Sequence, residues 1–119
     1  MKTEETVRFS PGEVICKQGD LGDFMLIILK GTAIVEIFGR QIAVVSEGQS
    51  VGEMAVMTPD GRCSATVQAK TEIIAEKIPR AEFLHLLNEA PPAIQTAFKT
   101  LVLRMTEMTQ AKALEFFGR

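Results

Sequence analysis

The chain has no tryptophan or tyrosine, one histidine and two cysteines among its 119 residues. Tryptophan and tyrosine are the usual stacking platforms for sugars and single-stranded nucleic acid, so their absence argues against such sites. The histidine, His85, cannot form a metal-ligand cluster alone, and no Ser–His or Cys–His arrangement is available for hydrolysis. We therefore expect no enzymatic activity, no metal and no cofactor.

Long apolar runs and basic runs are missing as well. No apolar stretch approaches the ~18 residues of a membrane-spanning helix, and the polar start is followed by no signal-type apolar run. The net charge of −2 argues against non-specific nucleic-acid binding. Cys16 and Cys63 lack metal-type spacing and are interpreted as reduced thiols. These observations predict a cytoplasmic protein that binds neither membrane nor nucleic acid.

The composition that remains is ordinary, with 46% hydrophobic and 24% charged residues. A chain of this length is one domain, 1–119, with a real core. Residues 6–78 form short strand-like runs between glycine turns, which is typical of an antiparallel β-sandwich, β-roll or jelly roll. The run 24–29 is nearly continuously apolar, which predicts a strand buried on both faces. The other expected strands are 6–9, 13–17, 33–37, 41–45, 66–69 and 73–78.

From residue 79 the apolar period changes from two to about 3.6, which predicts two C-terminal helices over 79–117. The first begins at Pro79, and the second runs from about Pro92 to about Phe116. Apolar residues of the second helix follow a heptad spacing, which predicts a homodimer through this helix or packing of the helix on its own β-roll. This heptad seam consists of Ile94, Phe98, Leu101, Met105 and Met108.

The most informative stretch is 51–67. Gly52 has no Cβ, so the backbone can approach a ligand closely there. Residues 53–57 predict one helical turn, whose first N–H groups attract an anion such as phosphate. Arg62 on the next strand would place a positive fork beside that anion, and Glu53 would accept a hydrogen bond from a sugar hydroxyl. Together these residues predict a pocket for a phosphorylated ribose.

At these residues the chain resembles the cyclic nucleotide-binding domain family. The phosphate-binding cassette of that family runs Gly-Glu-x-Ala, a short linker, and Arg-(Ser/Ala/Thr)-Ala-(Thr/Ser)-Val. The resemblance implies a β-roll with a short phosphate-binding helix, whose first amides and an arginine hold the cyclic phosphate while a glutamate takes the ribose 2′-hydroxyl. The ligand-binding residues implied here are Gly52, Glu53, Met54, Ala55, Arg62, Cys63 and Ser64.

One position departs from the family pattern. Arginine usually stands directly before Ser-Ala-Thr-Val, and this chain has Cys63 there, with Arg62 one residue earlier. Either the loop absorbs one residue through a bulge near Gly61, or Arg62 faces the wrong way, because a slip of one residue reverses the face of a strand side chain. We expect Cys63 to be a small buried residue or to lie at the pocket rim, and Ser64 to be a secondary contact.

The last helix closes the pocket in many members of the family. By resemblance to regulators of the catabolite-activator type, Arg104 and Thr109 are expected near the base and the ring. The C-terminal Phe116 and Phe117 are expected to seal the pocket, to cover core surface or to bind a partner.

The resemblance also bears on the ligand and the partners. Cyclic GMP binders of the family often have threonine directly after the arginine, which this chain lacks, so cyclic AMP is favoured. Transcription factors of the family continue into a helix-turn-helix, and this chain stops at Arg119, so no specific DNA binding is expected. The chain is interpreted as a free-standing sensor, a regulatory subunit or a fragment of a larger protein.

Two functions stay open. The first is a cyclic nucleotide sensor or regulatory domain that signals through its C-terminal helix to a protein effector. The second is a degenerate β-roll that no longer binds nucleotide and serves as an interaction or dimerisation module, which the displacement of Arg62 by Cys63 supports. A metal-dependent cupin enzyme is excluded by the histidine count.

Overall fold

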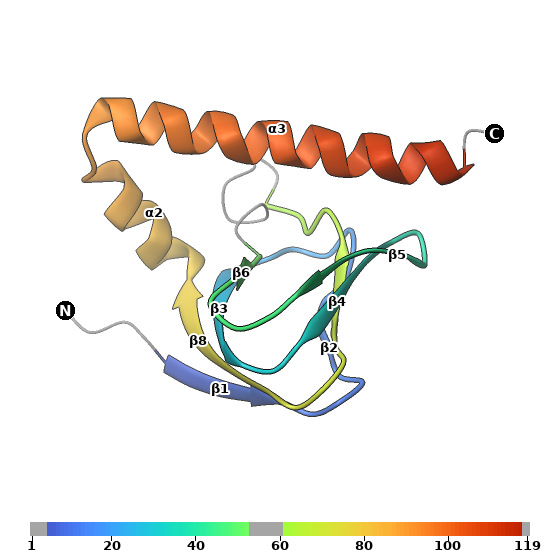
Figure 1. Ribbon diagram of the computed structural model, residues 1–119. Helices are drawn as coiled ribbons and strands as arrows, with labels where there is room; N and C mark the ends of the chain where they lie inside the picture. Colours follow the sequence, from blue (N-terminus) through green and yellow to red (C-terminus); the bar gives the residue numbers. More distant parts are fainter. Residues whose placement is uncertain (1–4, 53–60, 118–119) are drawn as a thin grey trace.

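The computed structural model describes the backbone of residues 5–52 and 61–117, and the side chains of these except 105, 106 and 108–117. The described residues form eight strands followed by two helices (Figure 1). The elements are β1 (Glu5–Phe9), β2 (Val14–Cys16), β3 (Phe24–Lys30), β4 (Ala33–Ile37), β5 (Arg40–Val45), β6 (Ser50–Val51), β7 (Thr66–Ala69), β8 (Ile73–Pro79), α2 (Arg80–Asn88) and α3 (Pro92–Phe117).

The strands form two antiparallel sheets of four, with the orders β1-β8-β3-β6 and β2-β7-β4-β5. Strands far apart in the sequence pair in both sheets, as β1 does with β8 and β2 with β7. The prediction of a mainly β, antiparallel roll with two C-terminal helices is confirmed. The short strand β6 was not predicted as a separate element, because two residues show no periodicity.

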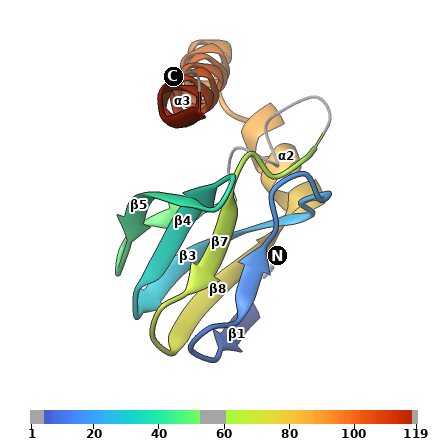
Figure 2. The same ribbon diagram turned by 90° about the vertical axis from the view of Figure 1, so that its right-hand side faces the viewer.

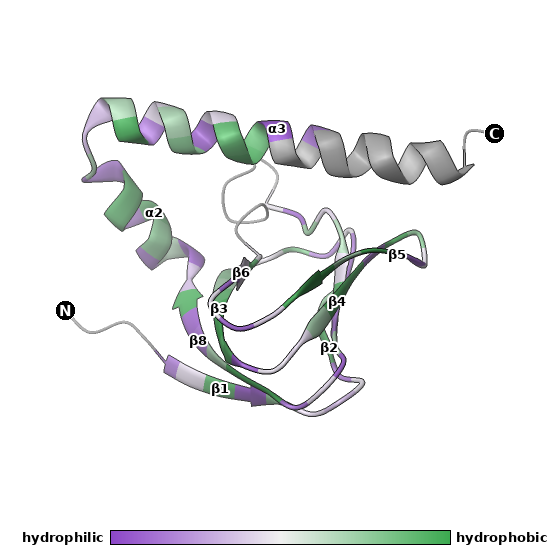
Figure 3. Cartoon of the chain, in the orientation of Figure 1, coloured by the Kyte–Doolittle hydropathy of each residue, from purple (hydrophilic) through white to green (hydrophobic). Residues whose placement is uncertain are grey.

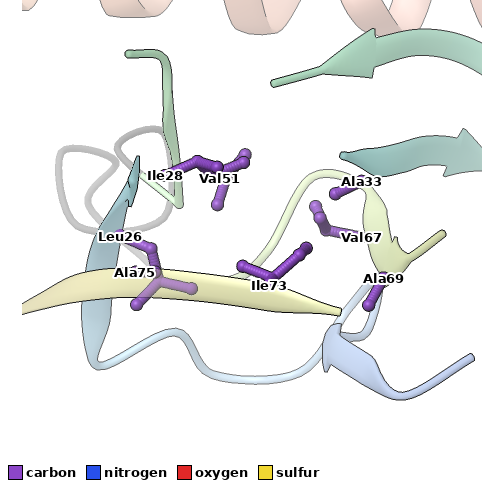
Figure 4. Close-up of a cluster of buried hydrophobic side chains, with 8 residues drawn as sticks. All are labelled: Leu26, Ile28, Ala33, Val51, Val67, Ala69, Ile73 and Ala75. Carbon is purple, nitrogen blue, oxygen red and sulfur yellow. The ribbon is translucent and has the colours of Figure 1, made fainter. Parts of the chain in front are cut away.

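The core lies between the two sheets. From one sheet, β3, β6 and β8 contribute larger aliphatic side chains and one alanine, and from the other sheet β4 and β7 contribute two alanines and one valine. Hydrophobic residues run along β3 and β5 (Figure 3). The buried cluster consists of Leu26, Ile28, Ala33, Val51, Val67, Ala69, Ile73 and Ala75 (Figure 4).

The expectation that 24–29 is buried on both faces is wrong at its end. Leu26 and Ile28 point into the core, but Leu29 is 50% exposed. The register between β3 and β8 shifts between Ile28 and Lys30. At its C-terminal end, β3 therefore has one face open to solvent. The apolar run continues to Leu29, one residue beyond the buried Ile28.

The helices lead away from the roll and then return across one end of it (Figures 1 and 2). The rings of Phe83 in α2 and Phe98 in α3 lie with centroids 5.8 Å apart. Gln95 Nε2 donates to the carbonyl oxygens of Asn88 at 3.1 Å and Ala90 at 2.8 Å. These contacts satisfy carbonyls at the end of α2 and hold the bend between the helices.

Helix α3 contacts β5, and its Val102 is buried at 4% exposure. Two residues of the predicted heptad seam are not buried as Val102 is, because the exposed fraction is 55% for Ile94 and 57% for Leu101. The expectation that this seam packs on the chain's own roll is therefore wrong for these two residues. Within the described residues, no helix is long and apolar enough to span a membrane.

Candidate functional site

The roll holds a cavity of about 300 Å³, and Val51, Gly52 and Cys63 of the predicted cassette belong to its wall. Its lining comes from β2, the loop between β2 and β3, the start of β3, the end of β6 and the segment before β7. The lining residues are Val14, Ile15, Cys16, Lys17, Asp20, Leu21, Gly22, Asp23, Phe24, Leu26, Val51, Gly52 and Cys63.

One wall of the cavity is a short ladder between the loop after β2 and the segment before β7. The Gly19 amide donates to the Cys63 carbonyl at 2.9 Å, and the Cys63 amide donates to the Asp20 carbonyl at 2.8 Å. The Gly22 amide donates to the Gly61 carbonyl at 2.7 Å. These bonds give both segments a defined register, which decides which side chains face the cavity.

Gly52 lines the cavity, as the sequence predicts for a residue of the site. Its φ is +90°, and a Cβ there would lie 2.9 Å from the Phe24 carbonyl oxygen. The need for glycine therefore arises from close packing on β3 as well as from the backbone conformation. The other cassette residues of this stretch, Glu53, Met54 and Ala55, lie outside the described residues.

Arg62 and Cys63 face opposite ways. Arg62 is exposed, forms an isolated antiparallel bridge with Leu21, and donates from Nη1 to the Gly19 carbonyl at 2.8 Å. Cys63 is 6% exposed and lines the cavity. Within the described residues, Cys63 belongs to the cavity lining and Arg62 does not. The side chain at the cavity is thus a thiol, and phosphate contact by Arg62 remains a prediction.

The remaining predicted residues lie further from the lining. Ser64 is half-buried and Arg104 is exposed on α3, and neither belongs to the described lining. Thr109 lies on the described backbone of α3, but its side chain is outside the described set, as are those of Phe116 and Phe117. Their contacts with a ligand stay predictions.

Charged lining residues were missed by the sequence analysis. Lys17, Asp20 and Asp23 all line the cavity. The sequence analysis placed the two aspartates in a glycine turn between strands and assigned them no role at the site. The repeated Gly-Asp pairs, Gly19-Asp20 and Gly22-Asp23, are the sequence signal that could have drawn attention to this turn.

The thiol of Cys63 has a perturbed acidity. A hydrogen bond with the Cys16 side chain lowers its pKa, while burial and the carboxylates of Asp20 and Asp23 act in the opposite direction. The hydrogen bond stabilises the thiolate, and the net pKa is below the ordinary cysteine value. Among the described residues, no group of three or more His, Cys, Asp or Glu side chains could hold a metal ion.

Comparison with known proteins agrees with the β-roll and its cassette. The family model described as "Cyclic nucleotide-binding domain" matches residues 6–90. The chain belongs to the cyclic nucleotide-binding domain family. The match covers the whole roll and α2, so the cavity of this domain lies inside the matched region.

Curated relatives are much longer than this chain. It is 34% identical over 116 residues to lysophospholipase nte1 of Aspergillus fumigatus, covering 93% of this chain and 8% of that protein. It is 38% identical over 82 residues to a cAMP-dependent protein kinase regulatory subunit of Debaryomyces hansenii, covering 68% of this chain and 18% of that one. The domain therefore corresponds to a small part of each relative.

Solved structures share the fold. Cyclic AMP-bound PfPKA-R superimposes with a TM-score of 0.75 at 23% identity, covering 98% of this chain and 38% of that one. The arrangement of roll and C-terminal helices is thus that of the cyclic nucleotide-binding domain.

Proposed function

We propose that this cyclic nucleotide-binding regulatory domain takes a cyclic purine nucleotide, cyclic AMP in preference to cyclic GMP, in the cavity beside Cys63. The observation that carries the proposal is the cavity itself, because Gly52 and Cys63, two residues of the predicted cassette eleven positions apart in the sequence, line it together. The relatives support the ligand class, since one is a cAMP-dependent regulatory subunit. The preference for cyclic AMP is supported by the absence of threonine after Arg62.

The phosphate environment differs from the family pattern. Lys17 is a cation on the described lining, and Asp20 and Asp23 add negative charge to it. Arg62 would have to exchange its bond to the Gly19 carbonyl before it could reach a ligand. A charge-assisted arginine–phosphate contact contributes about 1.5–3 kcal/mol. We therefore expect affinity about ten- to a hundredfold below that of a micromolar site.

Helix α3 is the proposed output element. Asp23 lines the cavity, and its carbonyl accepts the Arg80 amide at 2.7 Å, so the first residue of α2 is tied to the cavity wall. The bend contacts of Gln95 and Phe98 then link α2 to α3. A ligand changes the position of α3 only if it binds one arrangement more tightly.

Isothermal titration with cyclic AMP and cyclic GMP tests the proposal in the native chain, in Arg62→Ala and in Cys63→Arg. We expect a Kd for cyclic AMP of roughly 10–100 μM. Cys63→Arg places the cation on the cavity side, and it should tighten binding by about ten- to a hundredfold. Arg62→Ala should change affinity less than about threefold if Arg62 remains on the Gly19 carbonyl.

The two variants separate the outcomes. A collapse of binding in Arg62→Ala would assign the phosphate contact to Arg62 and contradict the outward geometry as the bound state. Absence of binding up to millimolar nucleotide in both the native chain and Cys63→Arg would overturn the proposal. Binding only in Cys63→Arg would show that the native domain has lost its ligand.

The second candidate is an interaction or dimerisation module without nucleotide. It is favoured by the thiol at the arginine position and by the exposed Ile94 and Leu101 of α3. A homodimer or a protein effector would use this helix face. The cytoplasmic location and the absence of catalysis in any longer protein likewise stay predictions.

A further inference from the structure

The loop between β2 and β3 is bonded to the rest of the roll through Gln18. The Phe38 amide donates to Gln18 Oε1 at 2.9 Å, and the Gln18 amide donates to Thr66 Oγ1 at 2.9 Å. Phe38 lies in the turn between β4 and β5, and Thr66 is the first residue of β7. Gln18 therefore joins three segments that are far apart in the sequence.

The neighbours of Gln18 line the cavity. Lys17 and Asp20 belong to the described lining, whereas Gln18 does not. The Gly19 amide donates to the carbonyl of Cys63, which is a third lining residue. The contacts of Gln18 are thus made beside the cavity wall, and they bear on the position of the wall rather than on a ligand directly.

Strand β2 gives this loop little support of its own. It has three residues, it pairs with β7 at the edge of its sheet, and its register shifts between Val14 and Cys16. The next strand in the sheet order is β4, beyond β7. The Gln18 side chain reaches the turn that follows β4, so it connects the loop to a part of the sheet that β2 does not contact by pairing.

The turn that Gln18 holds is strained. Phe38 and Gly39 have φ values of +51° and +79°, and a type I′ turn requires positive φ at both of its central residues. A bulky residue in this region persists only where its surroundings enforce the conformation. The Phe38 side chain is 64% exposed, so its burial offsets little of the strain. The hydrogen bond to Gln18 is a restraint that keeps the turn in place.

We propose that Gln18 is a positioning residue of the cavity, whose side-chain bond to the strained Phe38 turn holds the loop 17–23 in the arrangement that binds the ligand. The effect on affinity rests on the proposed function, because the ligand is the cyclic nucleotide. The hold on the loop does not, since it is a contact within the chain.

Three variants separate this role from a general loss of stability. Gln18→Met keeps the length of the side chain and removes the acceptor, while Gln18→Glu keeps an acceptor oxygen. The matched control is Gln49→Met, because Gln49 Oε1 accepts the Ser46 amide at 2.8 Å within its own turn and Gln49 is outside the described lining. Both Met variants therefore lose one bond between a glutamine side chain and a backbone amide.

Amide hydrogen exchange by NMR tests the hold on the loop without any ligand. In Gln18→Met, the amides of Phe38, Gly19 and Cys63 should exchange about three- to tenfold faster than in the native chain, because a local opening loses one opposing hydrogen bond. Gln18→Glu should restore most of the protection. Gln49→Met should leave these three amides unchanged.

The core amides of Ile28 and Ala69 report global opening in the same spectra. Both are bonded to backbone carbonyls of other segments, and their exchange should stay within about twofold of the native rate in Gln18→Met. An unchanged rate at Phe38 would overturn the proposal. Equal acceleration at Phe38 and at the two core amides would also overturn it, because the effect would then be global.

Isothermal titration with cyclic AMP tests the consequence for the site. Gln18→Met should raise the Kd about three- to tenfold, and Gln49→Met should change it less than about twofold. Urea denaturation should show similar losses of stability in the two variants, so a general effect of stability on binding would weaken both equally. Native affinity in Gln18→Met, or equal weakening in both variants, would overturn the positioning role.

The two measurements distinguish the failure of this proposal from that of the proposed function. A native chain that binds no cyclic AMP contradicts the proposed function, and the exchange rates still decide whether Gln18 holds the loop. Faster exchange confined to Phe38, Gly19 and Cys63 in that chain supports the hold on the loop, and unchanged exchange overturns it.

Discussion

At the scale of the residue, the site depends on which of two neighbours faces the cavity. Arg62 is exposed beside an isolated bridge, and its neighbour Cys63 is buried in the cavity lining. The ladder with the loop after β2 sets the choice, because Cys63 exchanges two backbone hydrogen bonds with that loop while Arg62 binds the Gly19 carbonyl from outside. The pKa of Cys63 is lowered by the hydrogen bond with the Cys16 side chain, although burial at this position acts in the opposite direction.

The pH dependence of alkylation should show that acidity. Because the Cys63 pKa is lowered in the fold, its reaction rate with iodoacetamide should rise at lower pH than in the unfolded chain. Removing the hydrogen bond in Cys16→Ala leaves burial, Asp20 and Asp23, which all raise the pKa, so the midpoint should move to higher pH. Peptide-resolved mass spectrometry measures the rate, and equal midpoints in both proteins would contradict this account.

Gly31 should be intolerant of a side chain. Its φ is +106°, and a Cβ would lie only 2.2 Å from the Glu72 carbonyl oxygen. Gly39 is the matched control, because its φ is +79° and nothing lies within 4 Å of its Cβ position. We expect Gly39→Ala to cost about 1–2 kcal/mol in unfolding free energy from backbone strain, and Gly31→Ala to cost about 1–3 kcal/mol more from the clash. Urea denaturation measures both, and similar costs would contradict the clash.

At the scale of the element, β3 connects the core to the cavity. It pairs with β6 and β8, contributes Leu26 and Ile28 to the buried cluster, and presents Phe24 and Leu26 to the cavity lining. The packing of β3 in the core therefore positions one side of the candidate site.

Two leucines of β3 separate core packing from strand propensity. Leu26 is 0% and Leu29 50% exposed, so Leu26→Ala should lower the unfolding free energy by about 2–5 kcal/mol by leaving a cavity. Leu29→Ala removes the same atoms from a half-exposed site and should cost less than about 1 kcal/mol. Denaturant midpoints compare the two variants. Equal losses of unfolding free energy would show that strand propensity, and not burial of the leucine, determines the cost.

At the scale of the whole molecule, α3 is a long helix that crosses one end of the roll (Figure 1). Val102 is buried while Ile94 and Leu101 are exposed, so the helix contacts the domain on one side and presents these two residues of the seam to solvent. If two copies pair, this seam is the surface that would be covered.

Sedimentation velocity tests that pairing. We expect a dimer for the native chain and a monomer for the double variant Ile94→Glu and Leu101→Glu, because two charges would be buried at the seam. Lys99→Glu changes the charge of an exposed α3 residue and should leave the dimer intact. A native chain that sediments as a monomer would contradict this prediction and leave the seam to a different partner.

The sequence by itself determined the order of the elements and the family. The glycine-punctuated runs and the change of period at Pro79 are local signals, since turns and helical repeats depend on near neighbours. The cassette pattern from Gly52 to Val67 was recognisable for the same reason, because its residues are contiguous.

Only the tertiary structure decided what faces the cavity. The exposure of Arg62, the place of Cys63 in the cavity lining and the exposed end of β3 all depend on backbone pairing between segments far apart in the chain. A shift of one residue reverses every side chain of a strand, and periodicity alone does not state the register. The sequence therefore determined that a nucleotide-binding roll is present, and sheet pairing decided that its cavity presents a thiol where the family has an arginine.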